Sequence, residues 1–166
     1  MIGKFLRRIR RNHALEHATI ALLGRRHPGA QVIGLSGPRG FLLYTNLSLQ
    51  EVFPAVRDAL KFLKAGHDSL AIHENCGTNL VAAAAMTTAV TALGMRRRKQ
   101  DFGERLESVL KLTTLNAFAL LMARPVGSWL QSKLTVDTHV EDLDISYIRS
   151  EGQGEARRIR VYTRQP

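Results

Sequence analysis

Apolar residues recur at helical spacing in two stretches of the first half of the chain. A first helix is expected from about Gly3 to Gly24, because good helix formers such as Ala and Leu dominate its second half. A second helix is expected over Ser48–Lys64, where Ser48 and Glu51 have the spacing of a capping box. Its predicted buried stripe repeats every three or four residues and consists of Val52, Ala55, Val56, Ala59, Leu60 and Leu63.

Short apolar runs predict strands on both sides of the middle of the chain. Gln31–Leu35 and Phe41–Thr45 flank a turn rich in glycine, which predicts a hairpin. Ser69–Ile72 predicts a further short strand, and Thr135–Ile148 and Ala156–Thr163 predict two more that join the same sheet. We therefore expect an α+β polar domain with a small mixed sheet of four or five strands and two helices.

Two long stretches almost free of charge interrupt this polar domain. Asn75–Met95 contains no charged residue, and Leu112–Leu130 contains only Arg124. Each is about long enough to cross a bilayer at 1.5 Å per residue. They predict a helical hairpin in the membrane, joined by the charged loop Arg96–Glu107; the alternative is a soluble helix pair buried in a core. The expected domains are a split polar domain, residues 1–74 and 133–166, and a hairpin, residues 75–132.

The net charge of +10 and the pI near 10.6 favour an anionic partner. Met1–Arg11 mixes basic and apolar residues, which is typical of a segment on anionic lipid. Nucleic acid is the weaker expectation, because aromatic residues make up only 6% and no recognition module is visible. The single cysteine, Cys76, excludes an internal disulfide. Without a signal peptide in this sequence, we expect a membrane location with the polar domain in the cytoplasm.

The most informative motif lies in the first predicted helix and reads His13-Ala14-Leu15-Glu16-His17. Helical spacing brings His13, Glu16 and His17 to roughly one side of the helix. Two imidazoles one turn apart can share a metal ion, and the carboxylate between them can act as a general base on a metal-bound water. This is the order of the inverted zincin motif. The alternative is an amphipathic helix whose histidines pack locally.

A second stretch, His73–Asn79, places a histidine close to the only cysteine, where a predicted strand gives way to a helix. Zinc accepts nitrogen and sulfur ligands, so His73 or Cys76 can complete a site begun by His13 and His17. We therefore expect zinc as the cofactor. The alternative is an ordinary helix N-terminus with an inert, buried cysteine.

The two motifs in combination, His13-Ala14-Leu15-Glu16-His17 and Cys76-Gly77-Thr78-Asn79, followed by an apolar hairpin, carry a resemblance. The chain resembles an uncharacterised family of bacterial membrane proteins, known only as a domain of unknown function. The resemblance implies membrane association and supplies no activity.

Two functional hypotheses follow from the motifs. The first is a membrane-associated, zinc-dependent hydrolase of inverted zincin type, in which Glu16 is the general base. The second is a non-catalytic membrane subunit or assembly factor, with protein partners in a membrane complex, in which the same residues hold a structural metal or none. Inverted zincin peptidases also use an acidic ligand on a later helix. Here the later candidates are His73, Glu74 and Cys76, which departs from that pattern.

Overall fold

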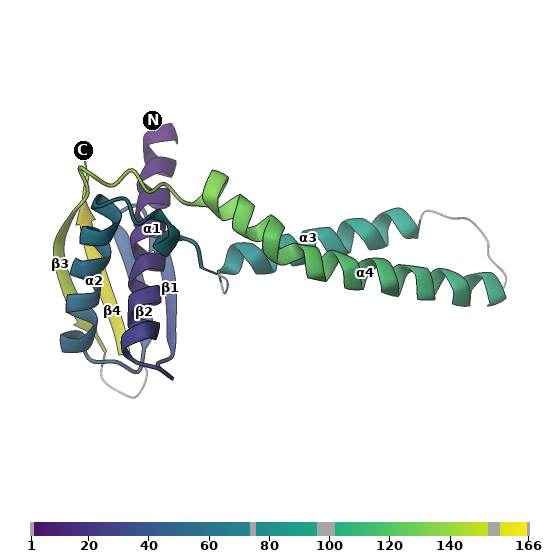
Figure 1. Cartoon of the computed structure of the whole chain (residues 1–166), viewed down its shortest axis with the longest axis horizontal. Helices are drawn as coiled ribbons and strands as arrows, with labels where there is room; N and C mark the ends of the chain where they lie inside the picture. Colours follow the sequence, from purple (N-terminus) through teal and green to yellow (C-terminus); the bar gives the residue numbers. More distant parts are fainter. Residues whose placement is uncertain (1, 74–75, 96–101, 153–156, 166) are drawn as a thin grey trace. The chain divides into compact units, whose positions relative to one another are not determined.

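The computed structural model describes residues 2–73, 76–95, 102–152 and 157–165 (Figure 1). The chain divides into two compact units, residues 1–73 with 132–166 and residues 74–131. The elements in chain order are α1 (Ile2–Arg26), β1 (Val32–Gly37), β2 (Gly40–Thr45), α2 (Leu49–Lys64), the 3-10 helix η1 (Asp68–Ala71), α3 (Gly77–Gly94), α4 (Phe102–Leu130), the π-helical turn η2 (Gln131–Thr135), β3 (Asp144–Glu151) and β4 (Arg157–Arg164).

The first unit is built on a four-stranded sheet with the order β1-β2-β4-β3. The α+β class is confirmed, and the sheet is antiparallel instead of mixed. The predicted β1–β2 hairpin closes with Gly37 opposite Gly40. Gly40 has a φ of +136°, and a Cβ atom there would collide with the carbonyl oxygen of Val161 on the neighbouring strand. Glycine is therefore required at this turn.

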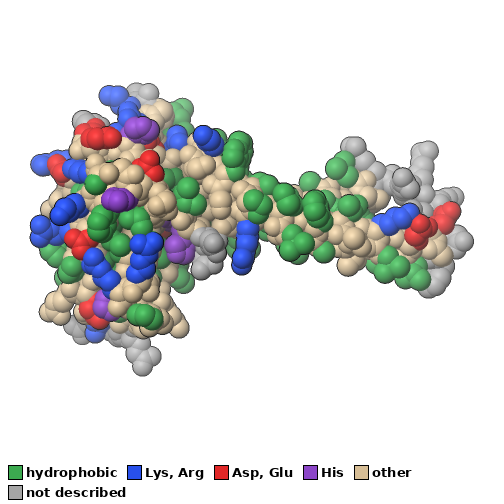
Figure 2. Space-filling view, viewed as in Figure 1, with side chains coloured by type: hydrophobic (Ala, Val, Ile, Leu, Met, Phe, Trp, Pro, Cys, Tyr) green, Lys and Arg blue, Asp and Glu red, His purple; other side chains and the backbone are tan. Residues whose placement is uncertain are grey.

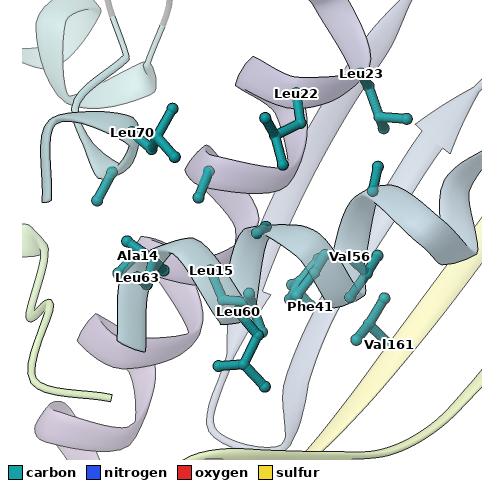
Figure 3. Close-up of a cluster of buried hydrophobic side chains, with 14 of the residues drawn as sticks. Ala14, Leu15, Leu22, Leu23, Phe41, Val56, Leu60, Leu63, Leu70 and Val161 are labelled. Atoms are coloured by element: carbon teal, nitrogen blue, oxygen red, sulfur yellow. The ribbon is translucent and has the colours of Figure 1, made fainter. Parts of the chain in front are cut away.

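The core of the first unit lies between the sheet and the two long helices, which cover the same face of the sheet (Figure 1). Phe41 and Leu43 of β2 point toward the helices, and Ile159 and Val161 of β4 lie beside them. These side chains meet the apolar stripes of α1 and α2 in one continuous cluster (Figure 3). The predicted stripe of α2 is buried at all six positions.

The N-terminus of α2 has the predicted capping box. The Ser48 hydroxyl accepts a hydrogen bond from the Glu51 amide, and the Glu51 carboxylate accepts one from the Ser48 amide at 2.7 Å. Hydrogen bonds from Ser48 lower the pKa of Glu51. The boundary of α2 could be read from sequence because this motif is local.

Two of the predicted strands need correction. Ser69–Ile72 is wrong as a strand, because residues 68–71 form η1 and no sheet neighbour is present among the described residues. Thr135–Ile148 becomes a strand only from Asp144. Earlier in this stretch, the Asp137 amide donates to the Arg10 carbonyl of α1. Its apolar residues are buried through core packing rather than through a sheet ladder: Val136, Val140 and Leu143.

The second unit is a pair of helices, α3 and α4, that pack against each other. The two helices approach closely at Gly94, where a Cβ atom would displace the Leu112 side chain. Asn116 of α4 donates to the Thr91 hydroxyl of α3 at 3.2 Å. The helix α4 begins ten residues before the predicted Leu112, so part of the expected charged loop is helical; residues 96–101 lie outside the described residues.

Both helices are long and apolar enough to cross a membrane, over Gly77–Gly94 and Gly103–Thr135. Only 11% of each candidate span is buried within the chain. The soluble alternative requires a core that buries the helix pair. The described residues of this chain do not supply such a core. Figure 2 shows hydrophobic side chains on the surface of this unit, with few charged groups among them.

Candidate metal centre

The second half of α1 buries polar side chains against the sheet. Asn12 is fully buried, and its amide nitrogen donates to the Gly37 carbonyl of β1 at 2.7 Å. Its side-chain oxygen accepts from the Thr163 hydroxyl of β4, also at 2.7 Å. Because unpaired polar groups are costly to bury, these bonds determine how α1 is rotated and placed on the sheet.

Glu16, one turn further along α1, is 4% exposed and meets β1 through two residues. Its carboxylate accepts a hydrogen bond from the Ser36 hydroxyl. A Cβ atom at Gly34 would collide with the same carboxylate. The strand β1 therefore provides both a donor and the space for this carboxylate.

His13 is held by the chain that returns from the second unit. Its Nδ1 lies 2.9 Å from the Thr135 carbonyl oxygen. A carbonyl oxygen can only accept, so Nδ1 donates, and in the neutral ring Nε2 carries the lone pair. The Thr135 carbonyl is in place because Arg10 donates to the carbonyls of Lys133 and Val136, on either side of it.

His17 is held in the same way by η1. The ring is 3% exposed, and its Nδ1 lies 2.7 Å from the Ala71 carbonyl oxygen. Nδ1 therefore donates here too, and Nε2 carries the lone pair of the neutral ring. Metal-binding histidines commonly have this arrangement, in which one ring nitrogen is fixed by a carbonyl and the other binds the ion.

Three imidazoles lie close together in the first unit. The ring centroids of His13 and His17 are 4.2 Å apart, and those of His17 and His73 are 5.9 Å apart. Zn–N distances of about 2.1 Å in a tetrahedral site put the centroids of two ligating rings roughly 5 Å apart. The two measured separations lie on either side of this value, and imidazole nitrogens are among the ligands that zinc accepts. The structure thus brings His73 to the histidines of the motif, which the sequence offered only as one alternative.

Cys76 belongs to the second unit, where it is the N-cap of α3. Its sulfur accepts a hydrogen bond from the Thr78 amide at 3.4 Å. Only Glu74 and Asn75, outside the described residues, separate it from His73. Three residues of extended chain span at most about 11 Å, so Cys76 is tethered near His73 by the chain itself.

Sequence reasoning missed the residues that hold the motif in place. Asn12 directly precedes His13, but nothing in the sequence marks this polar residue as buried. The sequence predicts only a strand at Gly34 and a turn at Ser36. Their spacing of two residues places both on one face of β1, which the sequence shows, but it does not show that Glu16 is their partner. The Ala71 and Thr135 carbonyls carry no side-chain signal at all.

Comparison with known proteins identifies relatives without assigned functions. The family model described as a domain of unknown function, DUF6391, matches residues 8–148. An uncharacterized protein from Picosynechococcus sp. is 29% identical over 136 residues. That match covers 76% of this chain and 65% of the relative, so the chain spans less than two thirds of that protein. No solved structure matches the chain significantly.

The contact between Gly34 and Glu16 leads to a first prediction. Gly34→Ala should lower the free energy of unfolding by about 1–3 kcal/mol, because the new methyl group overpacks the carboxylate. In a Glu16→Ala background the same change should cost less, since the colliding group is gone. Chemical denaturation of the four proteins measures this coupling.

Gly24→Ala is the matched control, because a Cβ atom at Gly24 meets nothing within 4 Å. This change should leave stability unchanged or raise it by up to about 1 kcal/mol. Equal costs of Gly34→Ala with and without Glu16 would show that the two residues do not interact.

Proposed function

This chain belongs to the DUF6391 family, and we propose that it is a membrane-associated zinc-binding protein, with zinc-dependent hydrolysis as its activity. The observation that carries the proposal is the pairing of His13 and His17. Each ring donates from Nδ1 to a backbone carbonyl, so each neutral ring presents Nε2 as its metal-binding atom. His73 is the proposed third ligand, and the tethered Cys76 is available as a fourth.

The hydrolase proposal depends on the number of protein ligands. Zinc held by three protein side chains keeps a position for water and makes that water a nucleophile near neutral pH. In this arrangement His13, His17 and His73 would hold the ion, and Glu16 would take up the proton as general base. The hydrogen bond from Ser36 holds the Glu16 carboxylate in one orientation.

A second candidate, a structural zinc site in a non-catalytic membrane subunit, is favoured by the surroundings of Glu16. This side chain is 4% exposed and bonded to Ser36, so it also serves to attach α1 to β1. If Cys76 binds the ion together with the three histidines, all four positions of a tetrahedral site are filled by protein. A closed site of this kind stabilises the fold and has no place for water.

Membrane association is proposed from the two apolar helices of the second unit and from the start of α1. Ile2, Phe5 and Leu6 are at least half exposed in α1, next to basic residues. That combination suits the interface of a membrane with anionic lipid. We propose that the polar unit lies on the cytoplasmic side, because a chain with a single cysteine forms no internal disulfide and suits a reducing compartment.

The metal site is tested by elemental analysis of protein purified without chelator from zinc-replete cells. We expect about one zinc per chain, and its loss in the double variant His13→Ala with His17→Ala, since two of three ligands are removed. His73→Ala should weaken zinc binding. His67→Ala is the control, because His67 is an exposed residue that packs on Phe62. Wild-type protein without metal would refute the site.

Glu16→Gln separates the two candidate functions. The amide keeps the size of the side chain but cannot accept a proton, so a general base is lost while the histidine ligands remain. We expect normal zinc content and the loss of hydrolysis, or of the cellular phenotype that the histidine variants share. Ser36→Ala serves as the comparison, since it removes the hydrogen bond and keeps the carboxylate. If Glu16→Gln behaves as wild type while the histidine variants fail, the zinc is structural.

Membrane association is tested by fractionation. The full chain should pellet with membranes and resist carbonate extraction, because two apolar helices insert together. Replacing Asn79–Leu130 by a short linker should release the polar unit into the soluble fraction. Full-length protein that is monomeric and soluble without detergent would contradict this proposal.

A further inference from the structure

A groove of about 440 Å³ runs between α2 and the edge strand β3 in the first unit. Its lining combines apolar and basic residues: Arg57, Leu60, Lys61, Lys64, Ala65 and Ile145. Leu60 is almost completely buried and Ile145 is half-buried, so these two residues form an apolar floor. The three basic residues are exposed along the helix beside this floor.

The acidic side chains of α2 do not neutralise these cations. Asp58 binds Arg26 of α1 at 2.5 Å, and Glu51 is held by the capping box. The one acidic partner among the described residues is Asp144, which binds Lys64 at 3.2 Å. Arg57 and Lys61 therefore leave the groove with an excess of positive charge. Figure 2 shows basic and hydrophobic side chains side by side over this part of the first unit.

The positions of the basic residues in α2 destabilise this helix through repulsion between like charges. Arg57 and Lys61 are four residues apart, and like charges at this spacing destabilise an isolated helix. Lys61 and Lys64 lie in the last turn, where they stabilise the negative end of the helix dipole. Arg57 lies too far from that end for the same explanation. An external anion bound between Arg57 and Lys61 removes the repulsion.

Arg57 is also oriented by a neighbouring aromatic ring. Its guanidinium lies 5.8 Å from the centroid of the Phe53 ring, one helical turn earlier. Phe53 is 43% exposed and extends the apolar surface beside the basic residues. The contact with Phe53 restricts the Arg57 side chain, so this side chain loses less conformational entropy when it binds an anion.

We propose that this groove binds an anionic amphiphile, with its phosphate or carboxylate on Arg57 and Lys61 and its alkyl chain over Leu60 and Ile145. Charge complementarity selects the head group, and the apolar floor selects a ligand with a hydrocarbon tail over a free anion. A membrane lipid and a soluble amphiphile share this chemistry. The proposal rests on neither the zinc site nor the hydrolase activity.

The test uses the full chain in nanodiscs of phosphatidylcholine and titrates octyl phosphate below its micelle concentration by calorimetry. Empty nanodiscs give the correction for partitioning into lipid. Octyl phosphate should bind at least about tenfold more tightly than inorganic phosphate, since a buried tail contributes about 0.8 kcal/mol per CH₂ group. Octanol, which has the same tail and no charge, should bind at least about tenfold more weakly than octyl phosphate.

Arg57→Gln with Lys61→Gln should weaken the binding of octyl phosphate by about tenfold or more, because two charge-assisted hydrogen bonds are lost. Ala65→Asp should have the same effect by placing a carboxylate in the groove at an exposed position. The matched control is Arg25→Gln with Arg39→Gln, which removes equal charge from exposed positions outside the groove and should leave the affinity unchanged.

Hydrogen exchange in nanodiscs with and without phosphatidylglycerol identifies the source of the ligand. Protection of residues 57–65 by phosphatidylglycerol alone indicates a membrane lipid, and protection only after octyl phosphate is added indicates a soluble amphiphile. The proposal is overturned if folded wild-type protein binds no octyl phosphate. It is also overturned if inorganic phosphate binds as tightly, or if the groove variants bind as tightly as wild type.

Discussion

The buried polar side chains of α1 determine how the first unit is assembled. Asn12, Glu16 and His17 are each less than 5% exposed, and their hydrogen-bond partners lie on β1, β4 and η1. Leaving any of these groups unpaired in the core would cost about 1–3 kcal/mol or more. The helix can therefore take only the position in which β1, β4 and η1 all reach it. The surrounding apolar cluster also stabilises that position, but apolar packing is less specific for one position of the helix than these hydrogen bonds are.

One helix thus serves two purposes through neighbouring residues. Asn12 and Glu16 attach α1 to the sheet, whereas His13 and His17 meet backbone carbonyls from outside the sheet. The support of the histidine rings comes from main-chain groups, so it does not use the side-chain chemistry of Ala71 and Thr135. In Glu16 the structural role and the proposed chemical role cannot be separated, because the carboxylate that accepts from Ser36 is also the proposed general base.

The positive charge of the chain is partly neutralised where the return segment crosses α1. Asp137 pairs with Arg7 and Arg11, and His139 donates to the same carboxylate. Burial raises the pKa of Asp137, but the hydrogen bonds from His139 and the charge of Arg11 outweigh it, so the pKa lies below its ordinary value. A lowered carboxyl pKa stabilises the folded state at neutral pH, and this contribution is lost as the pH falls toward the folded pKa.

The sequence alone determined the features that depend on near neighbours in the chain. The capping box of α2, its buried stripe, the β1–β2 hairpin and the helical spacing of His13 and His17 all follow from residues within one or two turns.

Only the tertiary structure decided which distant groups meet them. It formed the 3-10 helix Asp68–Ala71 where the sequence predicts a strand, so that the Ala71 carbonyl meets His17, and it placed Gly34 and Ser36 around Glu16. Together with the contact between His13 and the Thr135 carbonyl, these contacts join residues 18 to 122 positions apart, and two of the four partner groups are backbone carbonyls. Carbonyl groups are present at every position of the chain, so no residue pattern marks the ones that are used.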